Sequence, residues 1–187
     1  MIVVMGLPGA GKTTVLQGAV AGFGDWKVLN YGDMMLEIAK GERLVRERDE
    51  MRKLPLKEQR RVQDMVGDKL SGMKGKVILD THCSVHTLTG YMPGLPFEQL
   101  RKLNVDYLVF IAAPPRDIAS RRQRDTTRKR DAVSIEDIER DMLVNIAYLC
   151  AYSTLSGATA SIIMNADGKL DEAVGKLKEI IRSVKEE

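Results

Sequence analysis

Short apolar runs alternate along this chain with longer segments in which apolar residues recur at helical spacing. A buried strand appears in a sequence as a short apolar run, whereas a helix shows one apolar face. Strands that alternate with helices in this way predict parallel βαβ units. The predicted strands are residues 2–5, 26–30, 76–82, 106–113 and 160–165.

The predicted helices are marked by their apolar faces and caps. The first carries Val15, Leu16 and Ala19, and Asp33 is placed to cap the second. The glycine- and proline-rich segment 90–96 predicts a rigid loop without regular structure. Two helices between the second and third strands predict a small helical lobe. The remaining helices are predicted over residues 55–70, 97–103, 114–124, 134–155 and 170–184.

Composition narrows the class of protein. A chain of 187 residues with 44% hydrophobic residues suits one domain with small inserted lobes. A net charge of +3 and 5% aromatic residues argue against a nucleic-acid partner. No apolar run reaches the ~20 residues of a membrane helix, and the N-terminal run lacks the features of a signal peptide. We therefore expect a cytoplasmic protein with no membrane partner.

The two cysteines, Cys83 and Cys150, have neither metal-type spacing nor a companion cluster of ligands. They predict free, neutral thiols rather than a disulfide or a metal site.

The candidate chemistry begins directly after the first predicted strand. Gly6, Gly11, Lys12 and Thr13 fill the pattern G-x-x-x-x-G-K-[ST] between a strand and a helix. Backbone N–H groups and the helix N-terminus would cradle phosphates, which Lys12 would also contact. The competing interpretation is a glycine turn that binds nothing. The residues predicted to bind a nucleotide here are Gly6, Leu7, Pro8, Gly9, Ala10, Gly11, Lys12, Thr13 and Thr14.

Asp80 follows the apolar part of the third predicted strand, residues 77–79. A carboxylate at this point can hold Mg²⁺ through water, together with the hydroxyl of Thr13. The sequence therefore predicts a magnesium site at Thr13 and Asp80. The alternative is an aspartate that caps the next turn.

A run of basic residues follows the fourth predicted strand. Arginine binds phosphate through a planar fork that does not deprotonate, so such a run suits phosphoryl transfer. Lys12, Arg121, Arg128 and Arg130 are the predicted catalytic residues, whereas Arg122 and Lys129 are expected on a solvated face. The short polar segment 125–132 is typical of a mobile lid. The alternative for the whole run is a solvated helix face.

A second charged stretch, Arg48–Lys53, lies in the predicted helical lobe. It either binds a second phosphate-bearing substrate or forms a salt-bridged helix surface, and the residues alone leave both open. His82 is expected to make a polar contact to substrate rather than to act as a base, because a phosphate acceptor is already anionic. His86 is expected to be structural, and Met35 to border a base pocket.

With these motifs, the sequence resembles the archaeal-type adenylate kinases, which are P-loop nucleoside monophosphate kinases. The similarity runs nearly end to end, and its most specific blocks are Tyr-Gly-Asp at 31–33, Asp-Glu-Met-Arg-Lys-Leu at 49–54 and Gly-Tyr-Met-Pro-Gly-Leu-Pro at 90–96. The resemblance implies an α/β P-loop NTPase-type three-layer fold with a five-stranded parallel sheet. It also implies a core of residues 1–29, 60–121 and 136–187, a monophosphate-binding lobe at 30–59 and a lid at 122–135.

The same resemblance implies Mg²⁺-dependent transfer of the ATP γ-phosphate to AMP, giving two ADP, in a chain that is expected to form a homotrimer. Arg121 and Asn165 would lie near the adenine of ATP. Leu36 stands where better-known bacterial kinases have an arginine for the AMP phosphate, so Arg48 or Arg52 would supply that contact. The predicted AMP-binding residues are Tyr31, Gly32, Met35, Arg48, Arg52, His82 and Gly94.

Two other functions stay open on the residues alone. The acceptor could be UMP, CMP, dephospho-coenzyme A or another small molecule, because sequence physics does not identify the base. The chain could also be an ATP-driven conformational switch that phosphorylates no metabolite.

Overall fold

The structure, a computed structural model, describes residues 1–87, 90–125 and 134–184, without the side chain of Arg52. In this part of the chain, one sheet has the order β2-β3-β1-β6-β7, and all its neighbouring strands are parallel. The strands are β1 (Ile2–Gly6), β2 (Trp26–Asn30), β3 (Lys76–Asp80), β6 (Tyr107–Ala112) and β7 (Thr159–Met164). The predicted five-stranded parallel sheet is therefore confirmed.

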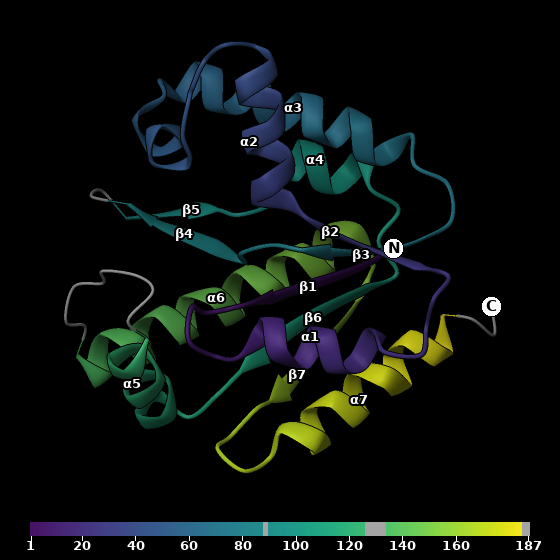
Figure 1. The fold of residues 1–187 in the computed structure, drawn as a ribbon, viewed down its shortest axis with the longest axis vertical. Helices are drawn as coiled ribbons and strands as arrows, with labels where there is room; N and C mark the ends of the chain where they lie inside the picture. Colours follow the sequence, from purple (N-terminus) through teal and green to yellow (C-terminus); the bar gives the residue numbers. More distant parts are fainter. Residues whose placement is uncertain (88–89, 126–133, 185–187) are drawn as a thin grey trace.

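Helices cover both faces of this sheet and give three layers (Figure 1). On one face, α1 (Lys12–Val20) and α7 (Leu170–Ser183) pack on the alternate strand residues that include Ile2, Val4 and Ile111. On the other face, buried residues of α3 (Leu56–Ser71), α4 (Phe97–Lys102), α5 (Pro115–Arg124) and α6 (Ile135–Ser156) form a second cluster around Phe110. Both faces of the sheet are apolar, as parallel sheets require.

The predicted helical lobe is present between β2 and β3. It consists of α2 (Tyr31–Gly41), the short 3₁₀ helix η1 (Arg48–Lys53) and the start of α3. Ala39, Val45 and Val62 form a small core of their own beneath these elements. This lobe lies above the sheet in Figure 1, at the end where β1 leads into the glycine-rich loop.

The helix α2 begins three residues earlier than predicted, and its cap is Asn30 rather than Asp33. The Asn30 side chain accepts a hydrogen bond from the Asp33 N–H group at 3.0 Å. Asp33 therefore lies inside the first turn, where its negative charge favours the helix N-terminus.

The prediction of an irregular loop at residues 90–96 is wrong for its first half. Gly90–Pro93 forms β5, which pairs antiparallel with β4 (Ser84–Thr87). Pro93 is tolerated because it is the last residue of an isolated two-stranded ladder, where a missing N–H group costs little. This hairpin lies between the helical lobe and α6 in Figure 1.

No helix in residues 1–87, 90–125 and 134–184 has the length and apolar character needed to cross a membrane.

Candidate functional site

The glycine-rich loop between β1 and α1 depends on glycine at defined positions. Gly9 and Gly11 have φ values of 91° and 81°, which strain residues with a side chain. At Gly11 an added Cβ would also lie 2.3 Å from Nδ2 of Asn165, and at Gly6 it would lie 2.7 Å from the carbonyl oxygen of Ile111. These glycines therefore let the loop pack closely against β6 and the turn after β7.

The first turn of α1 has the properties of a phosphate site. Gly11 is the N-cap residue, and no side chain caps the helix. The N-terminal N–H groups of a helix carry partial positive charge and need acceptors, which a phosphate group supplies. Thr13 and Thr14 belong to this turn, as the sequence predicts.

Lys12 and Asp80 contact each other directly. The ammonium group forms an ion pair with Oδ1 of Asp80, while Nδ2 of Asn30 donates to Oδ2 at 2.9 Å. Both charged side chains are largely buried, and burial lowers the pKa of Lys12 to about 8. The nearby carboxylate favours the charged ammonium, so the two effects oppose each other.

This pairing brings the predicted phosphate-binding lysine and the predicted magnesium ligand to one point. Because parallel strands end at the same edge of the sheet, β1, β2 and β3 deliver Lys12, Asn30 and Asp80 together. Asp80 and the Thr13 hydroxyl are oxygen donors of the kind that Mg²⁺ prefers. The described residues contain no cluster of three or more His, Cys, Asp or Glu that could hold a metal unaided.

Arg121 lies at the opposite side of the glycine-rich loop. Its guanidinium group donates to the carbonyl oxygens of Ala10 at 3.3 Å and Asn165 at 3.0 Å. It also donates to the Asp167 carboxylate, through Nε at 2.9 Å and Nη2 at 2.5 Å. Asn165 itself donates through Nδ2 to the Ala10 carbonyl at 2.8 Å, so helix α5, the loop and the turn after β7 are joined.

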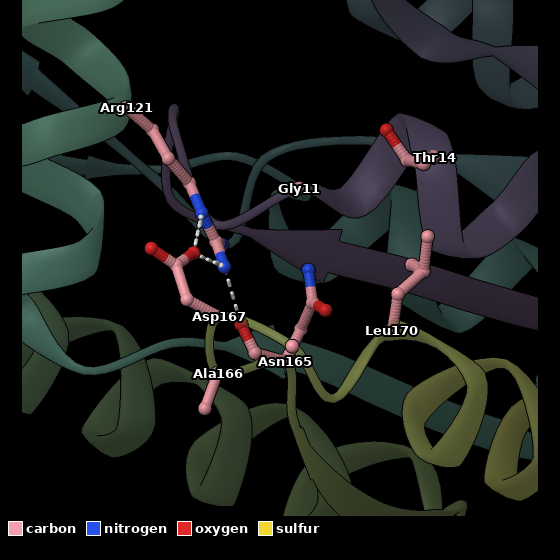
Figure 2. Close-up of a pocket in the computed structure, with 8 residues that line it drawn as sticks. Gly11, Thr14, Arg121, Asn165, Ala166, Asp167 and Leu170 are labelled. Atoms are coloured by element: carbon pink, nitrogen blue, oxygen red, sulfur yellow. Dashed lines mark hydrogen bonds and ion pairs between the residues drawn. The ribbon is translucent and has the colours of Figure 1, made fainter.

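A cavity of about 280 Å³ opens beside these groups. Figure 2 shows Arg121 and Leu170 on opposite sides of it, with the Asn165 side chain between them. The size and the mixture of apolar and polar walls suit a planar heterocycle. The lining residues are Gly11, Thr14, Arg121, Asn165, Ala166, Asp167, Gly168 and Leu170.

The prediction that Arg122 lies on a solvated face is wrong. Its Nε donates to the Pro8 carbonyl at 2.8 Å, and its side chain packs on Gly9, where an added Cβ would lie 3.1 Å from its Cγ. The sequence could not show this, because only the position of α5 against the loop decides it. Arg128, Lys129 and Arg130 lie outside the described residues.

On the lobe side, the structure brings Arg48 to the start of α2. Its guanidinium group forms an ion pair with Asp33, and its Nη1 would lie 3.6 Å from a Cβ added at Gly32. The Met35 side chain is half-buried and packs against the lobe core. The prediction for Arg52 falls on a side chain outside the description.

The other residues predicted on this side differ in exposure. Tyr31 is 3% exposed and packs in the core cluster near Asp64, so its side chain faces inward. Burial raises the pKa of its hydroxyl. His82 is exposed, and Gly94 approaches it so closely that an added Cβ would lie 1.9 Å from the His82 carbonyl oxygen. This contact joins the end of the β4–β5 hairpin to the loop after β3.

Sequence reasoning missed Asn30, Asp117 and Asp167 as parts of the site. Asn30 is the last residue of the second strand and Asp167 follows Asn165 by two residues, so position at a strand end was the available signal. Asp117 gave no such signal, because it lies within a helix. Its Oδ2 accepts from the Asp167 N–H group at 2.8 Å.

Comparison with known proteins agrees with this geometry. The family model described as AAA domain matches residues 5–139. Solved shikimate kinases from Bacteroides thetaiotaomicron and Acinetobacter baumannii superpose with TM-scores of 0.62 and 0.61 at 16% and 19% identity. The first match covers 97% of both chains, and the second covers 98% of this chain and 93% of the other. The family match, the fold and the glycine-rich loop with Lys12 thus define a P-loop protein.

Sequence relatives identify the family within this class. Curated adenylate kinases from Methanopyrus kandleri and Methanocaldococcus jannaschii are 44% and 41% identical, covering 98% and 97% of this chain and 98% of each relative. The adenylate kinase from Pyrococcus abyssi is 43% identical, and the alignment covers 97% of this chain and 94% of that enzyme. The chain belongs to the adenylate kinase family.

Proposed function

We propose that this protein transfers the γ-phosphate of ATP to AMP and forms two ADP, with Mg²⁺ bound to the donor nucleotide. The observation that carries the proposal is the continuous site formed by the α1 N-terminus, Lys12 and the cavity beside Arg121. A nucleoside triphosphate has the same order of parts, with phosphates at one end and a planar base at the other. The family of the chain supports AMP as the acceptor.

In the proposed reaction an oxygen of the AMP phosphate attacks the γ-phosphorus while the bond to the β–γ bridging oxygen breaks. The acceptor oxygen is already anionic, so no general base is required. Lys12 would exchange its Asp80 partner for phosphate oxygens and offset the negative charge that develops on them. The Thr13 hydroxyl and the Asp80 carboxylate would hold the Mg²⁺ ion, which supplies further positive charge at the phosphates.

The position of Arg121 supports contact with the base of ATP. Its guanidinium group is held at the cavity beside Asn165 rather than at the Lys12 side of the loop. Charge against the transferred phosphate would then come from Lys12 and from the lid residues Arg128 and Arg130. We propose that residues 122–135 act as the lid that excludes water, which is the competing acceptor.

The acceptor would lie across the cleft, against the lobe of residues 30–59. Arg48 is held beside Gly32 by an exposed ion pair with Asp33, and an acceptor phosphate is a stronger partner for a guanidinium group than one carboxylate. Met35, Arg52, His82 and Gly94 complete the proposed AMP site, with Tyr31 contributing through its backbone.

The deciding experiment offers ATP with AMP, UMP, CMP or dephospho-coenzyme A and compares kcat/KM for each acceptor. We expect AMP to be preferred and two ADP to form for each AMP consumed. Preference for a pyrimidine monophosphate would reject AMP as the acceptor. ATP hydrolysis at a rate independent of every acceptor would instead favour a conformational switch.

Two further expectations accompany this function. Adenine nucleotides are cytoplasmic metabolites, so we expect the protein in the cytoplasm. We also propose the homotrimer that the family resemblance implies, which light scattering at several protein concentrations would test against a monomer.

A further inference from the structure

Asp167 lies in the turn between β7 and α7, at the edge of the cavity described above. Its Oδ1 accepts two hydrogen bonds from Arg121, one from Nε and one from Nη2 (Figure 2). Side-chain exposure is 21% for Arg121 and 53% for Asp167. The aspartate therefore holds the arginine from the solvent side of the cavity.

The Asp167 turn is itself fixed by helix α5. The backbone N–H group of Asp167 donates to Oδ2 of Asp117 at 2.8 Å, and Nη2 of Arg124 lies 3.9 Å from its Oδ2. Asp117 is in the first turn of α5, and Arg121 is one turn further on. Helix α5 therefore contacts the turn through Asp117 and Arg124, and the turn in return binds Arg121 through the Asp167 carboxylate.

These contacts determine where the guanidinium plane lies. Arg121 donates to acceptors on Ala10, Asn165 and Asp167, and guanidinium N–H groups donate in the plane of the group, so these hydrogen bonds lie along its edges. The flat faces of a guanidinium group stack on aromatic rings through cation–π attraction. Arg121 and Leu170 both line the cavity, and Figure 2 shows them on opposite sides of it, with the Asn165 side chain between them.

We propose that Asp167 is a positioning residue, which holds Arg121 as the stacking wall for the base of the donor nucleotide. This inference rests on the proposed function, because it assigns the cavity to the base of ATP. Asp167 does not need to touch the nucleotide. An asparagine in its place keeps an acceptor oxygen but loses the charge that strengthens both hydrogen bonds, so the Arg121 side chain gains rotational freedom and the stacking wall is held less firmly.

Isothermal titration calorimetry with two probes tests this role: ATP with Mg²⁺, and inorganic tripolyphosphate with Mg²⁺. Both probes carry the phosphates, but only ATP carries the base. We expect Asp167→Asn to weaken ATP binding about tenfold, which is the size of a cation–π contact in a partly desolvated site. Tripolyphosphate binding should change less than twofold.

Two matched variants complete the experiment. Asp171→Asn makes the same charge change four residues further on, at an exposed position in the first turn of α7, and should leave both affinities within twofold. Asp167→Glu keeps the carboxylate and should bind ATP more tightly than Asp167→Asn.

Three results would overturn the inference: unchanged ATP binding in Asp167→Asn, equal losses for ATP and tripolyphosphate, or wild-type protein that binds both probes equally well. The second result would mean that the aspartate supports the whole loop rather than the base cavity. Failure of the proposed function is seen separately, as absence of ADP formation from ATP and AMP, and it leaves the two-probe comparison intact.

Discussion

On the proposed donor side, Lys12 and Asp80 have side-chain exposures of 12% and 13%, whereas on the proposed acceptor side Arg48 and Asp33 are 56% and 65% exposed. The donor side, meaning residues 6–14, Asp80, α5 and the β7–α7 turn, is joined by hydrogen bonds between the loop, α5 and the turn, of which the Asn165–Ala10 bond is buried. The acceptor side, meaning α2, η1 and the start of α3, has a separate small core.

This difference indicates how the protein responds to its substrates. Buried ion pairs and their partners are costly to disturb, whereas exposed pairs contribute little. We therefore expect the donor side to be formed before the nucleotide arrives and the lobe to move when the acceptor binds. Rigidity on one side and movement on the other would let a kinase close over two substrates and exclude water.

The largest effect should come from Lys12→Ala. Loss of the ammonium group should lower kcat/KM by a factor of 10³ or more, about 4 kcal/mol of transition-state stabilisation. A coupled assay of ADP formation from ATP and AMP measures this, and circular dichroism confirms that the fold is intact. Activity within tenfold of wild type would contradict a role for Lys12 in phosphoryl transfer.

Gly94→Ala should produce the next largest effect. Its Cβ would clash with the His82 carbonyl oxygen, which is backbone and cannot rotate away. We expect a loss of about 2–4 kcal/mol in the free energy of unfolding, measured by urea denaturation. Gly24→Ala is the control, because no atom lies within 4 Å of its added Cβ, so its cost should stay below about 1 kcal/mol.

The substitution Arg48→Ala tests the acceptor side independently of the donor side. It should raise KM for AMP about tenfold, the effect of one exposed charge-assisted contact, and leave KM for ATP within twofold. Lys69→Ala breaks another exposed ion pair beside the lobe, with Glu37, and should leave both constants unchanged. Equal increases in both KM values would contradict the independence of the donor and acceptor sides.

The smallest effect concerns Cys83. Burial, with a further contribution from nearby Cys150, raises the pKa of the Cys83 thiol to about 12. The folded state then keeps a proton that the unfolded state releases above pH 9, so stability falls as pH rises from 9 towards 12, by at most about 1.4 kcal/mol per pH unit. Urea denaturation of wild type and Cys83→Ala at pH 8 and 10 should show this extra decrease in wild type alone.

A thiol-specific reagent gives an independent measurement of the same burial. In the native protein Cys150, which is exposed, should react quickly, and Cys83 only after unfolding. Equal reaction rates for the two thiols in the native protein would be inconsistent with the burial of Cys83.

The sequence by itself determined the sheet, most helices and the phosphate loop, because these follow from short-range patterns: apolar runs, helical spacing, caps and G-x-x-x-x-G-K-T. It missed both β4 and β5, since the proline and glycine content of residues 90–96 outweighed a strand pairing that only the folded chain provides. It also placed Asp33 rather than Asn30 at the cap of α2.

Only the tertiary structure decided which charged groups face one another. Lys12 and Asp80 are 68 positions apart in the numbering, and Arg121 meets Asp167 across 46 positions. No local pattern records such pairs, because they depend on the order of the strands and on the packing of α5 against the loop. The sequence therefore determined that a phosphate site exists, while the fold decided which side chains hold its lysine and border its base cavity.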